Sequence, residues 1–307
     1  MNEEGVHRES GPSSAGRVEF RVLGPVEALV DRREVPLGGP RQRALLGLLL
    51  LQPGRTVAAD QLIDSIWASE PPEGAGTTIR SYVSKLRSAL GTAAPIRGNS
   101  SGYSIEVAPD AIDAALFDQL VRKADEQLRQ GAARAADEQL SHALSMWRGR
   151  PFGELSEDGP LRVEADRLEE LRLHAIEQRL EAELTLGRPA EIIDELEAAV
   201  AQYPYREHLW RLLMLALYHS GRQADALAAY RRARTMLDEQ LGIDPSGDLQ
   251  ALEAQILRQE VPALVRTERR DNLPSPLTSF VGRDGELQHL VRLIADYTLS
   301  LHDALPI

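Results

Sequence analysis

The spacing of hydrophobic residues changes near residue 110, from short alternating runs to long helical stripes. Val18, Phe20 and Val22 alternate with polar residues, which predicts short strands across residues 18–37. Apolar faces at helical spacing then predict helices over 40–51, 59–67 and 77–90. Residues 96–107 have the pattern of a hairpin, with turn residues at 98–102. The predicted order within residues 17–108 is therefore sheet, three helices, hairpin.

From residue 112 onward the pattern is almost entirely helical. Three apolar stripes carry it: Phe117, Leu120, Ala124 and Leu128; Leu173, Ile176, Leu180 and Leu184; and Leu209, Leu212, Leu213, Ala216 and Leu217. The run GRPAE at 187–191 recurs as GRQAD at 221–225, an offset of 34 residues. This is the period of a tetratricopeptide (TPR) hairpin. We therefore expect a TPR-like all-α domain over residues 112–262.

The third predicted helix has the two faces that a DNA-reading helix needs. Ile79, Val83, Leu86 and Leu90 form an inner apolar face, while Thr77 is positioned to cap the start. The opposite face is polar and basic, which suits phosphate oxygens and base edges in the major groove. The predicted DNA-binding residues are Thr77, Thr78, Arg80, Ser81, Tyr82, Ser84, Lys85, Arg87 and Ser88 on this helix, Arg41 and Arg43 on the first helix, and Arg97, Asn99 and Tyr103 in the hairpin.

The charge distribution agrees with this interpretation, although the formal net charge of the chain is −12. Residues 17–108 contain eleven Lys/Arg against nine Asp/Glu, a net +2, and residues 74–105 contain no acid. The acidic balance therefore lies elsewhere in the chain. An ordinary solvated helix is the competing interpretation, and the position of this helix between a second helix and a Gly-rich hairpin favours DNA.

Residues 80–90 (RSYVSKLRSAL) and 102–105 (GYSI) resemble the recognition helix and wing of OmpR-type winged helix-turn-helix domains. Residues 23–26 (LGPV) and 39–46 (GPRQRALL) narrow the resemblance to the Streptomyces antibiotic regulatory protein family, whose larger members are AfsR-like. Residues 168–172, 215–227 and 241–245 (LGIDP) are similar to that family's bacterial transcriptional activator domain. The fold class expected is mainly α with a small α+β part.

The resemblance implies a transcriptional activator that binds double-stranded promoter DNA at direct repeats, often as a side-by-side pair or homodimer, and controls secondary metabolism. It also implies recruitment of RNA polymerase through the sigma factor and alpha subunit, with the loop at 68–75 near the polymerase. A cytoplasmic, nucleoid-associated location without membrane contact is expected.

Residues 273–287 resemble the start of the nucleotide-binding domain in AfsR-like proteins. Such a domain needs a Gly-Lys pair in its phosphate-binding loop, and the two lysines of this chain, Lys85 and Lys123, follow Ser84 and Arg122. We therefore expect residues 278–307 to be the truncated start of that domain, ending in an anomalous tail at 299–307. Residues 1–16 are expected to form a disordered arm and residues 263–277 a linker.

Enzymatic chemistry finds little support in the sequence. The chain has no cysteine, which excludes disulfides, thiolate metal ligands and a cysteine nucleophile. No two of its seven histidines have metal-ligand spacing on a helix, and its serines lack a nucleophile-elbow pattern. We expect no cofactor, no metal and no enzymatic activity. Two alternatives remain open: a fragment of an AfsR-like signalling ATPase regulator, and a helical protein-binding scaffold.

Overall fold

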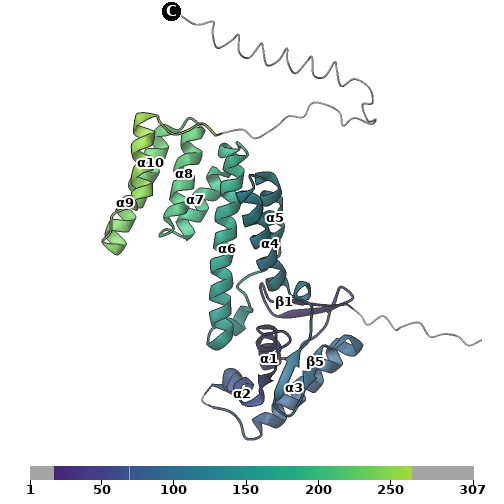
Figure 1. The fold of residues 1–307 in the computed structure, drawn as a ribbon. Coiled ribbons are helices and arrows are strands. Elements are labelled where there is room, and N and C mark those ends of the chain that lie inside the picture. The colour runs from purple at the N-terminus through teal and green to yellow at the C-terminus, as the bar shows by residue number, and fades with distance from the viewer. Residues whose placement is uncertain (1–16, 69, 265–307) are drawn as a thin grey trace, which may run out of the picture. The chain divides into compact units, whose positions relative to one another are not determined.

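The computed structural model describes residues 17–68 and 70–264. The expected disordered arm, the truncated nucleotide-binding segment and its tail lie outside the described residues, as does all of the expected linker except residues 263 and 264. Within the described part the predicted fold class is confirmed: a small α+β region precedes an all-α region (Figure 1).

The α+β region holds two small antiparallel sheets and three helices. Strands β1, β2 and β3 form a meander in which Val18 pairs with Val30, and strand β6 lies between β4 and β5 in the second sheet. The elements in chain order are β1 (Val18–Arg21), β2 (Glu27–Val30), β3 (Arg33–Glu34), α1 (Pro40–Leu50), β4 (Val57–Ala58), α2 (Ala59–Trp67), α3 (Ala75–Leu90), η1 (Gly91–Ala93), β5 (Ile96–Gly98) and β6 (Gly102–Ile105).

The all-α region consists mainly of helical hairpins. Its elements are η2 (Pro109–Ala111), α4 (Asp113–Arg129), α5 (Ala133–Ser145), η3 (Gly153–Ser156), α6 (Gly159–Thr185), η4 (Pro189–Ile192), α7 (Ile193–Gln202), α8 (Glu207–His219), α9 (Gln223–Leu241) and α10 (Gly247–Arg258).

The repeat at an offset of 34 residues corresponds to two tight helix-to-helix turns. Gly187 and Gly221 both have a φ of +76°, and each donates its N–H to the carbonyl three residues earlier. A third turn of the same geometry occurs at Gly131, between α4 and α5. The Gly131 turn does not follow the 34-residue period, because it lies 56 residues before Gly187. The left-handed φ explains why glycine occupies all three positions.

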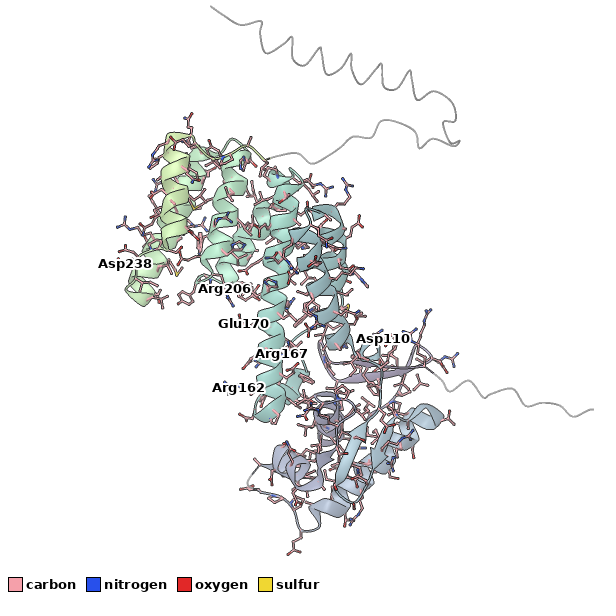
Figure 2. All side chains as sticks on the ribbon, viewed as in Figure 1. Asp110, Arg162, Arg167, Glu170, Arg206 and Asp238 are labelled. Carbon is pink, nitrogen blue, oxygen red and sulfur yellow. The ribbon has the colours of Figure 1, made fainter. Side chains whose placement is uncertain are left out.

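Two hydrophobic cores meet along the 27-residue helix α6. Leu161, Ala165 and Leu168 belong to the first core, which also includes both sheets, α1–α3, α4 and α5. Leu180 and Leu184 belong to the second core, with α7–α10. The helix therefore buries different faces along its length. Glu170, midway along α6, forms an ion pair with Arg206, which precedes α8 (Figure 2).

Candidate DNA-binding surface

Helix α3 rests on α1 and α2 through the predicted apolar face. Ile79, Val83, Leu86 and Leu90 are buried, each at most 2% exposed. The helix begins at Ala75, two residues earlier than predicted, and Gly74 is its N-cap with a φ of +74°. The expectation that Thr77 caps the helix is therefore wrong. Thr77 lies inside the first turn, where its hydroxyl accepts a hydrogen bond from Arg80 Nη2 at 2.9 Å.

The outer face of α3 is exposed and carries no acid. Its exposed residues are Thr77, Arg80, Ser81, Ser84, Lys85, Arg87 and Ser88, and Thr78 is half-buried. Within residues 17–68 and 70–264, neither Arg80 nor Lys85 has a carboxylate partner. Because nothing neutralises them internally, both cations remain available to an anionic ligand.

Two further predicted residues pack around Trp67, the last residue of α2. The Tyr82 ring stacks on Trp67 with centroids 6.3 Å apart, and the Arg41 guanidinium lies 5.7 Å from the Trp67 ring centre. Tyr82 is half-buried, whereas Arg41 is exposed. Tyr82 thus fixes α3 against α2, and Arg41 holds a cation against the Trp67 ring.

The β5–β6 hairpin is attached to α3 and to β4. Arg87 Nε donates a hydrogen bond to the Ile96 carbonyl at 3.2 Å, which ties the end of α3 to β5. On the other side, the half-buried Tyr103 pairs with Val57 of β4. Gly102 pairs with Ala58, and a Cβ there would lie 2.0 Å from the Val57 carbonyl oxygen.

Asn99 and Arg97 both have partners within this region. The Asn99 side-chain oxygen accepts the N–H groups of Ser101 at 2.8 Å and Gly102 at 3.0 Å, so this side chain shapes the hairpin turn. Arg97 forms an ion pair with Glu106 at 3.4 Å and remains 64% exposed. Glu106 is the first acid after the acid-free stretch, and only the folded hairpin brings it beside Arg97.

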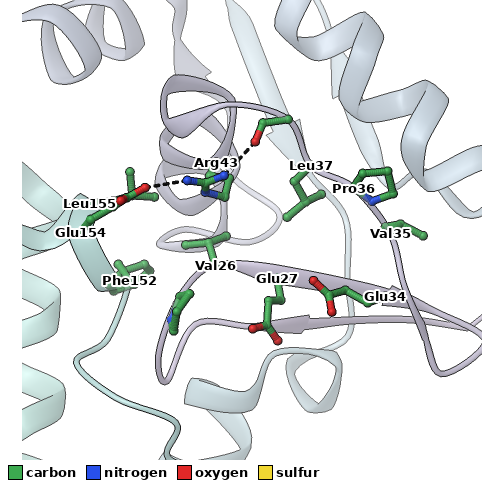
Figure 3. Close-up of a pocket in the computed structure, with 12 residues that line it drawn as sticks. Val26, Glu27, Glu34, Val35, Pro36, Leu37, Arg43, Phe152, Glu154 and Leu155 are labelled. Atoms are coloured by element: carbon green, nitrogen blue, oxygen red, sulfur yellow. Dashed lines mark hydrogen bonds and ion pairs between the residues drawn. The ribbon is translucent and has the colours of Figure 1, made fainter.

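The Arg43 guanidinium points toward Glu154 of the all-α region (Figure 3). Its guanidinium forms an ion pair with Glu154 of η3 at 2.6 Å and donates to the Gly38 carbonyl at 2.8 Å. Glu154 is 111 residues away in the sequence, so no local pattern could reveal this contact. Arg43 therefore holds η3 against the start of α1.

No cluster of three or more potential metal ligands occurs in the part of the chain that the structure describes. In the same residues, no helix is long and apolar enough to cross a membrane.

Comparison with known proteins identifies both regions. Residues 33–103 match the family model described as "Transcriptional regulatory protein, C terminal", and residues 112–257 match the "Bacterial transcriptional activator domain". The chain is 32% identical over 253 residues to the regulatory protein DnrI of Streptomyces peucetius, and the match covers 79% of this chain and 93% of DnrI. The chain belongs to the Streptomyces antibiotic regulatory protein family. Its two regions correspond to an OmpR-type DNA-binding domain and a bacterial transcriptional activator domain.

Larger relatives also match most of this chain. The match to AfsR of Streptomyces coelicolor is 39% identical and covers 90% of this chain, but only 29% of AfsR. EmbR of Mycobacterium tuberculosis is 39% identical, with 80% of this chain and 64% of EmbR covered. A solved structure of EmbR in complex with a low-affinity phosphopeptide superimposes with a TM-score of 0.78 at 38% identity, covering 81% of this chain and 67% of that one. This family member therefore spans less than a third of AfsR and about two thirds of EmbR.

Proposed function

We propose that the chain activates transcription by inserting α3 into the major groove of promoter direct repeats, with the β5–β6 hairpin, or wing, against the adjacent minor groove. The observation that carries this proposal is the exposed outer face of α3, where Arg80 and Lys85 lack carboxylate partners while the opposite face is buried. The proposed contact residues are Arg41, Thr77, Arg80, Ser81, Ser84, Lys85, Ser88 and Arg97.

Each part of this surface has a distinct chemical role. Arg80 and Lys85 neutralise phosphates or donate to guanine, and the serine and threonine hydroxyls donate to phosphates or base edges. Tyr82, Arg87, Asn99 and Tyr103 act indirectly, because their contacts hold α3 and the wing in place. Thr78 also acts indirectly, since its hydroxyl donates to the Gly74 carbonyl at the start of α3. The residues that touch DNA directly determine the affinity, and the residues that act indirectly maintain the shape of the DNA-binding surface.

The proposal extends to the transcription machinery on the basis of family membership. Two copies bind side by side on the repeats, and RNA polymerase is recruited through its sigma factor and alpha subunit. The α2–α3 loop supports this extension because residues 70–74 are exposed beside α3. The regulated genes are proposed to serve secondary metabolism, and the chain acts without catalysis or a cofactor.

The test begins by selecting bound duplexes from random DNA and measuring their affinity across a range of salt concentrations. The chain has two lysines, which provide a matched pair: Lys85 on α3 and the exposed Lys123 on α4. Lys85→Ala should weaken binding by about fivefold or more and reduce the salt slope by about one. Lys123→Ala removes the same charge from the all-α region and should leave both quantities unchanged.

Equal behaviour of the two lysine variants would contradict the docking. An absence of salt-dependent affinity in the unmodified chain would favour the helical-scaffold alternative instead. The polymerase contact is tested separately by replacing residues 70–74 with Gly/Ser. DNA affinity should persist while transcription in vitro falls, and unchanged transcription would remove the loop from the proposal.

A further inference from the structure

The segment joining the two regions is packed along the first sheet. It leaves β6 at Ile105, passes through η2, and reaches α4 at Asp113. Ile112 forms a parallel bridge with Phe20 of β1, and both side chains are buried. Asp110 in η2 lies beside this sheet (Figure 2). The start of the all-α region is therefore fixed to β1 by backbone pairing.

A charged cluster continues this attachment. The Asp113 carboxylate, 12% exposed, accepts the N–H groups of Val22 at 2.7 Å and Leu23 at 3.2 Å. Arg148, which follows α5, donates to the same carboxylate at 3.2 Å through Nη2. Its Nη1 lies 2.7 Å from the Glu27 carboxylate of β2. One guanidinium thus bridges an acid of the all-α region and an acid of the sheet.

The backbones approach closely at the same place. The Arg148 N–H donates to the Leu23 carbonyl at 2.8 Å, and the Phe152 N–H donates to the Val22 carbonyl at 2.9 Å. A Cβ added to Gly24 would lie 2.9 Å from the Arg148 Cβ. These hydrogen bonds are directional, and their strength falls steeply with misalignment. The two backbones therefore cannot slide past each other without losing them.

Stability alone is a weak reason for such a cluster. Burial raises the pKa of Asp113 above its ordinary value, although its donors act in the opposite direction. Paired charges removed from water often contribute little net free energy, and their best-attested use is to select one arrangement among several. Arg148 suits that use because its planar fork binds two acceptors in fixed directions.

We infer that Asp113, Arg148 and Glu27 form a positioning cluster that sets the direction in which the all-α region leaves the DNA-bound winged helix. It thereby determines how two copies fit on adjacent repeats. The inference about paired copies rests on the proposed function, whereas the fixed orientation of one copy does not. None of the three residues lies on the α3 surface, so they act through geometry rather than by touching DNA.

The chain has no cysteine, so two spin labels can be attached without background. Exposed Gln61 of α2 and Glu239 of α9 are suitable sites when each is changed to cysteine. The label-to-label distance distribution in the full chain should be narrow, and Asp113→Asn should shift or broaden it. Arg148→Lys is a milder second variant that keeps one charge but loses the fork. Asp118→Asn, which removes an exposed ion pair with Arg122 on the same helix, should leave the distribution unchanged.

Binding to one repeat and to two adjacent repeats then separates this inference from the proposed function. In Asp113→Asn and Arg148→Lys, affinity for one repeat should stay within about twofold, while cooperativity between two repeats falls by about tenfold. Unchanged distance distributions in folded variants would overturn the positioning role. If no variant or wild-type chain binds a single repeat, the proposed function fails while the distance result still decides the orientation of the two regions.

Discussion

Gly102 offers a sharp test of how the wing is held, because its neighbour is backbone rather than a flexible side chain. An alanine Cβ at this position would lie 2.0 Å from the Val57 carbonyl oxygen and 2.9 Å from the Ala58 Cα. Strand β4 would have to separate from β6, and the Val57–Tyr103 and Ala58–Gly102 pairs would be lost. Two hydrogen bonds at about 1 kcal/mol each, plus about 1 kcal/mol of strain, give a destabilisation of ~3 kcal/mol.

Calorimetry converts this figure into a melting shift. If both regions unfold together, Gly102→Ala should lower the Tm by roughly 6–12 °C. DNA affinity should fall as well, since β4 anchors the wing. Gly76→Ala is the matched control: this helical glycine has no atom within 4 Å of an added Cβ. It should retain or slightly raise the Tm, because alanine favours a helix. A Gly102→Ala protein that melts with the wild type would refute the close-contact argument.

Three further changes test other parts of the molecule. Glu106→Gln should release Arg97 and tighten DNA binding by roughly twofold to fivefold, since exposed ion pairs contribute up to about 1 kcal/mol. Fluorescence anisotropy would measure this gain in affinity. The gain should vanish when Arg97 is also changed to alanine. Burial lowers the pKa of His219 from 6.5, so the unfolded chain protonates first and the free energy of unfolding should decline as pH falls through 6.5. Urea titrations of His219→Gln should show a flatter decline, and an unchanged profile would contradict the assignment. Leu213→Ala, at a fully buried position in the second core, should cost about 2–5 kcal/mol in urea unfolding yet leave DNA affinity at low temperature intact.

Local patterns were sufficient to predict most of the elements. The inner face of α3 was predicted residue by residue because a 3.6-residue period is written in the sequence. The predicted start of α3 lies two residues after the observed one. The helix begins after Gly74, whose φ is in the left-handed region, rather than at Thr77, which has the residue type of a cap. Gly24 falls within the run at 23–26 that resembles the family, whereas its role as the docking point for Arg148 required the fold.

The candidate site was less predictable where side chains have partners far away in sequence. Exposure of Arg80 and Lys85 follows from helical spacing, and the structure agrees. Arg43 has the same charge, but it forms an ion pair with Glu154 in η3 of the all-α region. The Asn99 side chain accepts a hydrogen bond within its own turn, as its position between two predicted strands indicated. The contact roles on DNA stay predictions until binding is measured.

Strands β1 and β2 belong to the α+β region but also bind residues of the all-α region. This limits where the protein can be cut into stable fragments. A fragment cut at residue 108 would keep the first sheet but strip from Val22 and Leu23 the carboxylate that receives their N–H groups, and would uncover Phe20. The shorter fragment should thus be less stable, whereas one extended through α6 would retain the partners of that sheet that the described residues supply. We therefore expect the smallest fragment that folds and binds DNA by itself to extend beyond the winged helix-turn-helix at residues 17–108.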